Sequence, residues 1–175
     1  MTGYCFRLHT SGMSRNRWLV GATAVVAVAG GLHASSSPAS STAVPSCKEK
    51  VRHNVLPVWM RGGFTGPNPR VPYVIGERGA VGAVVFGWPL TSPESPGRGN
   101  KILWVPRHYS KTIAPFWIRL QLMNGDQAVG APIRKIIATG PGPSIVDVPT
   151  AGCWRLTLSW SGRRDTLDLN YSQPG

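Results

Sequence analysis

Residues 152–171 read GCWRLTLSWSGRRDTLDLNY, and this stretch decides the fold class. Apolar and polar side chains alternate along both of its halves, which is the period-2 pattern of strands that bury one face. The pattern predicts a β-hairpin with a core-facing side made of large apolar residues. These are Trp154, Leu156, Leu158 and Trp160 on the first strand, and Leu167, Leu169 and Tyr171 on the second.

Placing both apolar faces in one core also predicts a register for this hairpin. Leu158 then lies opposite Leu167, and residues 161–164 form the loop. A slip by one residue would turn the apolar side chains of the second strand outward, at about 1.5–3 kcal/mol for each. On the outer face, this register makes Arg155 and Asp168 diagonal neighbours.

Further short strands are expected upstream, because glycine (21 residues) and proline (16 residues) interrupt the chain too often for helices of normal length. The expected strands cover residues 55–60, 71–75, 80–90, 101–105, 116–123, 133–138 and 144–148, with a two-residue turn at 124–125. The apolar run over 80–90 does not alternate, which indicates either burial on both faces or a bulge at Gly87. The prediction is an all-β chain: a single immunoglobulin-like antiparallel β-sandwich over residues 47–175, which is long enough to bury a core.

The first 46 residues have the parts of an export signal. A basic lead with Arg7, Arg15 and Arg17 precedes an apolar run over 18–32, and a Ser/Ala/Pro-rich stretch follows. A span of about 18 or more apolar residues would be needed to cross a bilayer comfortably, which favours a cleaved signal over a permanent anchor. We therefore expect a signal peptide and linker over 1–46, and a secreted protein or one at the extracytoplasmic cell surface.

Cleavage would remove Cys5 and leave two cysteines, Cys47 and Cys153. In an oxidising compartment such a pair is expected to form a disulfide. Cys153 has the opposite strand parity to Trp154, which predicts a staple on an edge or outer surface rather than a bridge through the core. The alternative is lipid attachment at Cys47, which would leave Cys153 as a free thiol.

Three segments carry a resemblance to a known group of proteins. They are GAVVFGWPL at 82–90, NKILWV at 100–105 and GPSIVDVPTAGCWRLTLSWSGRRDTLDL at 142–169. The chain resembles small uncharacterised exported proteins of actinobacteria, and its Gly-Cys-Trp-Arg hairpin is similar to immunoglobulin-like β-sandwich domains of bacterial lipoproteins. The resemblance implies a fold and export, and it implies no activity and no functional residues.

Residue types that carry catalysis are sparse after residue 46. The histidines there are His53 and His108, which together with two paired cysteines make a poor metal set. No nucleophile elbow, phosphate-cradling loop or zinc-hydrolase helix is present in the sequence. We therefore expect no enzyme, with a hydrolase as the remaining alternative, and we expect no cofactor and no metal site.

The charge balance favours an anionic partner. The chain has a net charge of +12, and removing the three arginines of residues 1–46 leaves +9 on residues 47–175. An anionic cell-wall polymer, a glycan or a membrane surface would suit this charge. No nucleic-acid-binding module is recognisable, so no nucleic acid is expected.

The strand over 116–123 offers a candidate binding surface. Trp117 and Arg119 alternate with apolar residues and lie on its less apolar face, where an aromatic ring and a guanidinium could bind a sugar or an anion. Arg163 and Arg164 in the expected hairpin loop complete the candidate set. Two alternatives remain at this point: the Trp117 face packs on a second sheet or a loop, or the domain is a protein-interaction or inhibitor-like module that uses a sheet edge.

Overall fold

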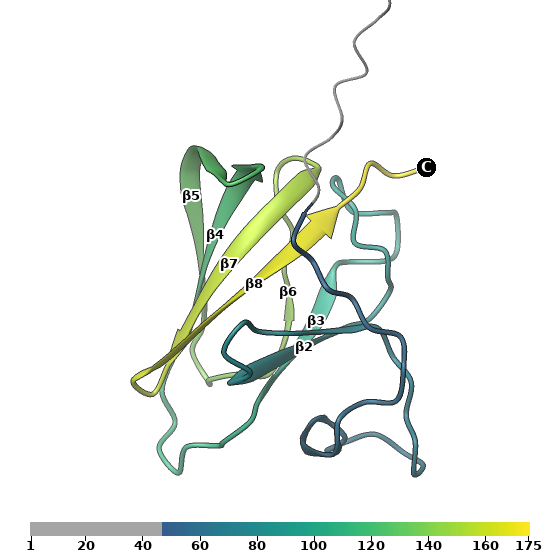
Figure 1. Cartoon of the computed structure of the whole chain (residues 1–175), viewed down its shortest axis with the longest axis vertical. Coiled ribbons are helices and arrows are strands. Elements are labelled where there is room, and N and C mark those ends of the chain that lie inside the picture. Colours follow the sequence, from purple (N-terminus) through teal and green to yellow (C-terminus); the bar gives the residue numbers. More distant parts are fainter. Residues whose placement is uncertain (1–46) are drawn as a thin grey trace, which may run out of the picture. The chain divides into compact units, whose positions relative to one another are not determined.

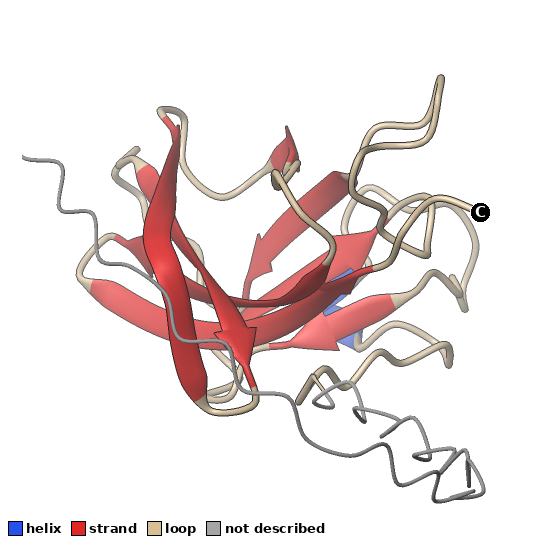
Figure 2. Cartoon of the chain, turned by 90° about the horizontal axis from the view of Figure 1, so that it is seen from above, coloured by secondary structure: helices blue, strands red, loops and turns tan. Residues whose placement is uncertain are grey.

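Two antiparallel sheets of four strands each make up residues 47–175, the part of the chain that the structure, a computed structural model, describes. The expected signal peptide and linker over 1–46 lie outside the described residues. The first sheet has the strand order β1-β2-β3-β6 and the second has the order β5-β4-β7-β8. The sheets pack face to face (Figure 1 and Figure 2), which confirms the expected all-β sandwich.

The strands are β1 (Tyr73–Ile75), β2 (Val81–Val85), β3 (Lys101–Pro106), β4 (Phe116–Asn124), β5 (Gln127–Ile137), β6 (Pro143–Ile145), β7 (Gly152–Trp160) and β8 (Arg163–Tyr171). A short 3-10 helix, η1 (Val58–Met60), precedes them. Within residues 47–175, no helix is long and apolar enough to cross a membrane.

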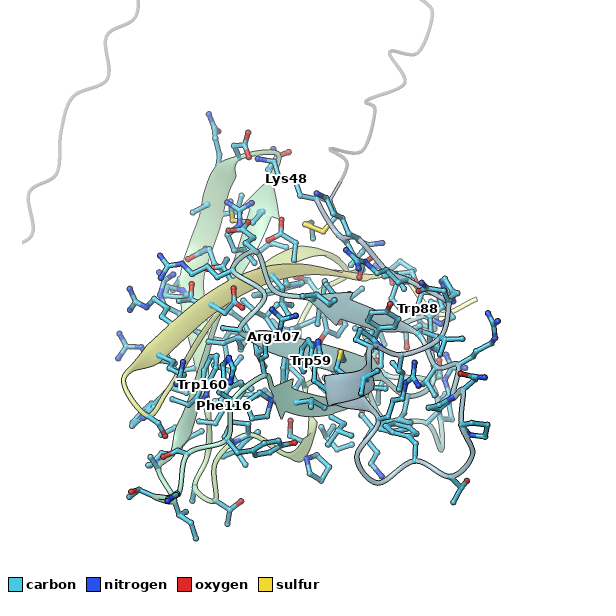
Figure 3. All side chains as sticks on the ribbon, turned by 60° about the horizontal axis from the view of Figure 1, so that its bottom comes forward. Lys48, Trp59, Trp88, Arg107, Phe116 and Trp160 are labelled. Atoms are coloured by element: carbon cyan, nitrogen blue, oxygen red, sulfur yellow. A yellow bond between two sulfur atoms is a disulfide. The ribbon has the colours of Figure 1, made fainter. Side chains whose placement is uncertain are left out.

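The core lies between the two sheets and is rich in aromatic side chains. The ring centroid of Phe116 of β4 lies 5.5 Å from that of Trp104 of β3 and 5.7 Å from that of Trp160 of β7. Phe116 and Trp160 are neighbours in Figure 3. Each such ring buries about 150–250 Å². The apolar faces predicted for the C-terminal hairpin are confirmed, because all seven of those side chains are buried.

The predicted register of this hairpin is wrong by two residues. Leu156 pairs with Leu167, and the turn consists of Ser161 and Gly162 alone, with φ of 43° and 73°. Positive φ at both central residues matches the right-handed twist of the flanking strands, which favours this tight turn over a four-residue loop. A two-residue shift keeps every side chain on its predicted face, so it leaves the core assignment intact.

The shift moves charged residues into the strand. Asp165 comes to lie opposite Leu158 on the core face, where it is fully buried. Arg155 and Asp168 are directly opposite rather than diagonal, and they form an ion pair in which Arg155 Nε and one Nη donate to the two carboxylate oxygens at 2.9 and 3.1 Å.

The strand expected over 55–60 is not formed. Residues 58–60 form the 3-10 helix η1 instead, and Leu56 before it and Met60 at its end are both fully buried in a small second cluster with Tyr73. This cluster packs against the outer side of the first sheet, where a Cβ added to Gly82 of β2 would overlap the Met60 side chain.

Two turns also differ from expectation. For the apolar run over 80–90, the alternative of burial on both faces is confirmed, because all five residues of β2 are buried. The alternative of a bulge is not: β2 ends at Val85, and Gly87, with a φ of 74°, lies in the turn that follows. The β4–β5 turn consists of Gly125 and Asp126, one residue later than predicted, and Asn124 pairs with Gln127. The strand β5 is longer than the expected 133–138, because its first half continues the hairpin beyond an irregularity in the pairing.

The predicted disulfide between Cys47 and Cys153 is present. Cys153 pairs with Met123 and Asn170, on the side of the sheet away from the core, so it forms the expected surface staple. From there the chain crosses to the first sheet, where Arg52 exchanges backbone hydrogen bonds with Tyr73 of β1 at 2.8 and 3.0 Å. We call residues 47–52 the N-terminal strap.

Candidate functional site

The outer face of the second sheet brings a tryptophan and three arginines together. Trp117 of β4 lies beside Ser159 of β7, and Ser159 lies opposite Arg164 of β8. Two residues further along β4, Arg119 lies opposite Arg134 of β5. Successive side chains of a strand point to opposite faces of the sheet. Because Phe116 and Ile118 point into the core, Trp117 and Arg119 point away from it. We call Trp117, Arg119, Arg134 and Arg164 the arginine face.

The arginine face surrounds a shallow depression of about 140 Å³, with Thr157 and Ser159 among its lining residues. Trp117 is 48% exposed, and its neighbour Ile136 on β5 is 54% exposed. The depression therefore combines apolar surface, hydroxyl groups and guanidinium groups in one place.

The cationic charge of this face is not neutralised by the protein's own carboxylates. Among the described residues, the ion pairs are Lys48–Asp126 and Arg155–Asp168. None of the three arginines has a carboxylate within 4 Å in that part of the chain. Arg119 donates instead to the side-chain oxygen of Gln121 at 3.3 Å. Three guanidinium groups are thus available to an external anion.

The structure unites most of the residues predicted from the sequence. Trp117, Arg119 and Arg164 line one depression, and Arg134 joins them. Arg163 does not, because it pairs with Trp160 and has the parity of the core-facing residues of β8. It lies exposed at the end of the sandwich. Arg134 is within a predicted strand, but no signal in the sequence indicates which strand its own strand pairs with.

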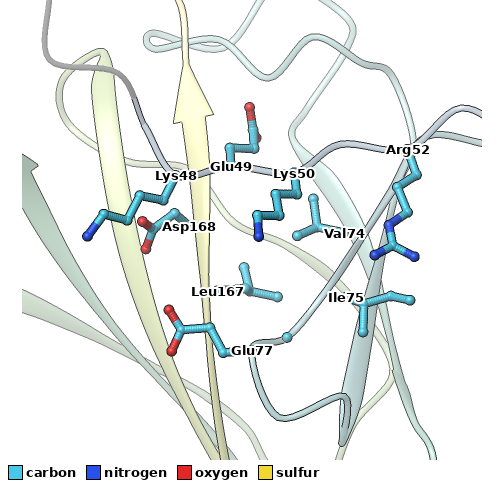
Figure 4. A pocket seen from close by; sticks show the side chains of 10 residues that line it. Lys48, Glu49, Lys50, Arg52, Val74, Ile75, Glu77, Leu167 and Asp168 are labelled. Carbon is cyan, nitrogen blue, oxygen red and sulfur yellow. The ribbon is translucent and has the colours of Figure 1, made fainter.

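A second, larger hollow lies beneath the N-terminal strap (Figure 4). It has a volume of about 560 Å³ and an apolar floor that includes Val74, Ile75 and Leu167. Its rim carries both charge signs, with Lys50 and Arg52 from the strap and Glu77 from the β1–β2 turn. The hollow lies between β1 of the first sheet and β8 of the second, because residues of both strands line it.

Glu49 of the strap is the titratable group of this hollow that is most perturbed. The pKa of its carboxyl group is raised from 4.5 to about 7, mainly by burial and to a smaller extent by the nearby charge of Asp168. The backbone N–H of Asn170 donates to Glu49 at 3.0 Å and opposes this shift by stabilising the ionised form. Glu49 therefore changes its charge near neutral pH, at the point where the strap touches β8.

One group of metal-ligand atoms comes together among the described residues, namely the sulfurs of Cys47 and Cys153 with a carboxylate oxygen of Asp168. Both sulfurs are bound in the disulfide, and Asp168 is bound to Arg155, so this group is not a metal centre in the oxidised protein. His53 lies beside Trp88, with ring centroids 6.3 Å apart.

Comparisons with known proteins found no matching family model, no significantly similar curated protein and no significantly similar solved structure.

Proposed function

We propose that the domain is a non-catalytic binding module that holds an anionic polymer or glycan of the cell envelope on its arginine face. The observation that carries the proposal is the grouping of three guanidinium groups, without carboxylate partners among residues 47–175, around the half-exposed Trp117. A cationic surface of this kind attracts anions over a distance of about 8–10 Å in physiological salt.

The spacing of the arginines favours a repeating anion over a single small one. Arg119 and Arg134 lie on neighbouring strands, roughly 5 Å apart at the backbone. Arg164 lies two strands beyond β4 and one residue pair along it, roughly 12 Å from Arg119 by the same spacings. A polymer with an anionic group on successive units can reach all three positions at once.

Trp117 supports a sugar-containing polymer in particular. An indole ring presents a flat apolar face that can stack on the C–H groups of a sugar ring, while the neighbouring hydroxyls of Thr157 and Ser159 can form hydrogen bonds. The exposure of about half of Trp117 within residues 47–175 favours such a stacking surface over the alternative that this face packs on a second sheet or loop.

Binding of the full chain to three soluble polymers tests the proposal: polyglycerol phosphate, polyglucuronate and uncharged dextran. We expect binding to the two anionic polymers that weakens steeply with added salt, and no binding to dextran. Arg164→Gln should weaken binding by about three- to tenfold, or about 0.6–1.4 kcal/mol.

Arg163→Gln is the matched control, because it removes the same charge one residue away on the other side of β8. It should change the affinity far less than Arg164→Gln. Equal effects of the two variants would mean that net charge alone governs binding, and the arginine face would then not be the site. Trp117→Ala should lower the affinity for polyglucuronate at a temperature at which the variant is still folded, because the exposed half of the ring is lost as a stacking surface.

A further inference from the structure

One flank of the sandwich is covered by the N-terminal strap, and the other flank is open. On one flank, the N-terminal strap runs from the disulfide on β7 past Asn170 of β8 to Tyr73 of β1. On the other flank, β5 and β6 are the last strands of their sheets, and no described segment pairs with their free edges. The opening between them has a volume of about 250 Å³. We call it the β5–β6 groove.

The β5–β6 groove is apolar at its lips and along most of its floor. Ile136 of β5 is 54% exposed and Ile145 of β6 is 49% exposed, although both are large hydrophobic residues. Ile118, Ile137 and Val146 lie beneath them. The free edge of β5 also presents backbone N–H and C=O groups that have no strand partner, and such an edge is a template for another extended chain.

Lys135 determines which chain could fit there. It has the parity of the core-facing residues of β5, because it pairs with the buried Ile118, and it lines the groove. No carboxylate lines this groove, and Lys135 has no ion-pair partner among the described residues. An inward-pointing charge on an edge strand opposes pairing with an ordinary apolar strand. A strand that carries a carboxylate at the facing position would remove that obstacle.

We propose that the β5–β6 groove receives an extended segment of a partner protein in which apolar and acidic residues alternate. The segment adds as a strand beside residues 133–137 of β5. Its apolar side chains lie beside Ile136 on the outer face of the sheet, and on the core-facing side one carboxylate pairs with Lys135. Pro132 has no N–H group and therefore limits the pairing to these residues. Five paired residues correspond to a strand roughly 17 Å long.

A second copy of this chain is a poor occupant of the same edge. Pairing β5 with β5 would bring Arg134 and Lys135 of both copies close together, and like charges across a strand pair are destabilising. A partner strand with a carboxylate on the core-facing side replaces this repulsion at Lys135 by an attraction.

Hydrogen exchange and NMR on the full chain can test this proposal with synthetic peptides of about nine residues. The main probe alternates valine and glutamate. One control has the same composition in two blocks, and a second alternates valine and lysine. We expect the alternating acidic peptide to slow amide exchange at residues 133–137 by about tenfold at saturation and to shift the methyl signals of Ile136 and Ile145. The block peptide should do neither.

Lys135→Glu provides the decisive variant, because it should transfer the preference from the valine–glutamate peptide to the valine–lysine peptide. Arg164→Gln should leave peptide binding intact while it weakens polymer binding, so the two proposals can fail separately. Protection that ignores residue order, or a preference that does not change in Lys135→Glu, would overturn the inference. Protection of 133–137 that rises with protein concentration without peptide would assign the edge to self-association and overturn it as well.

Discussion

Replacing Asp165 by asparagine should destabilise the protein by several kcal/mol, although the two side chains have the same shape. The Asp165 carboxylate is fully buried and accepts four backbone hydrogen bonds. One oxygen accepts from the N–H groups of Arg78 at 2.9 Å and Thr166 at 2.8 Å. The other accepts from the N–H groups of Ala80 at 2.8 Å and Val81 at 3.2 Å. This carboxylate thereby fastens the β1–β2 turn of the first sheet to β8 of the second.

The size of the effect follows from the number of donors at each oxygen. Asparagine keeps one acceptor oxygen. Its NH₂ group then points at the two backbone N–H groups whose hydrogen bonds the other oxygen accepted. Two charge-assisted hydrogen bonds are lost, at about 1.5–3 kcal/mol each, which gives about 3–6 kcal/mol. Rotation of the amide by 180° does not restore the lost hydrogen bonds, because two backbone N–H groups point at each of the two oxygen positions.

Guanidinium unfolding followed by tryptophan fluorescence measures this loss. Glu94→Gln is the control, because Glu94 is an exposed carboxylate in a loop, and it should leave the unfolding midpoint unchanged. A loss below about 1 kcal/mol for Asp165→Asn would refute the reasoning, since that is the size expected of one ordinary neutral hydrogen bond.

Three further predictions concern the disulfide, the strap and the hairpin turn. The double variant Cys47→Ala/Cys153→Ala should lose about 4.8 kcal/mol in guanidinium unfolding, because the bridge closes a sequence separation of 106 residues in the unfolded chain; a loss under about 1 kcal/mol would contradict this estimate. The raised pKa of Glu49 means that the folded state favours its protonated form, so its contribution to stability should be complete below pH 4.5 and disappear as the pH rises through 7. Glu49→Gln should remove this decline from the pH profile of the melting temperature, and an unchanged profile would be evidence against it. Ser161→Asn should raise the unfolding free energy by about 0.5 kcal/mol, because asparagine tolerates the positive φ of this turn position better than serine; no gain would mean that the turn carries no strain.

The faces of the hairpin could be predicted from the sequence, but its register could not. Alternation assigns each side chain to a side, and a shift by two residues leaves that assignment unchanged. The tight turn at Ser161 and Gly162 brings Asp165 into the core. No local signal marks this arrangement, because three of its four hydrogen-bond donors come from residues 84–87 positions away in the sequence.

In the candidate site, too, the face of each strand could be predicted from the sequence, but the pairing between strands could not. Alternation placed Trp117 and Arg119 on one face of one strand, which is a local property. Arg134 joins them through the pairing of β4 with β5, and this pairing includes an irregularity between Leu120 and Leu122 that a sequence pattern does not reveal. Arg163 and Arg164 were equivalent while they were assigned to a loop, and only the length of the turn separates them.

The buried carboxylate and the arginine face therefore depend on the same register. With its oxygens held by the first sheet, Asp165 fixes the position of β8 along β7, and the next residue towards the turn is Arg164. Strand alternation then requires Arg164 to point outward, opposite Ser159 and in the same row as Trp117. A four-residue loop would have left this arginine free to move, and its guanidinium group would lose conformational entropy on binding an anion. Held in a strand, it faces the ligand site before the ligand arrives, so a residue buried for stability also preorganises the surface proposed for binding.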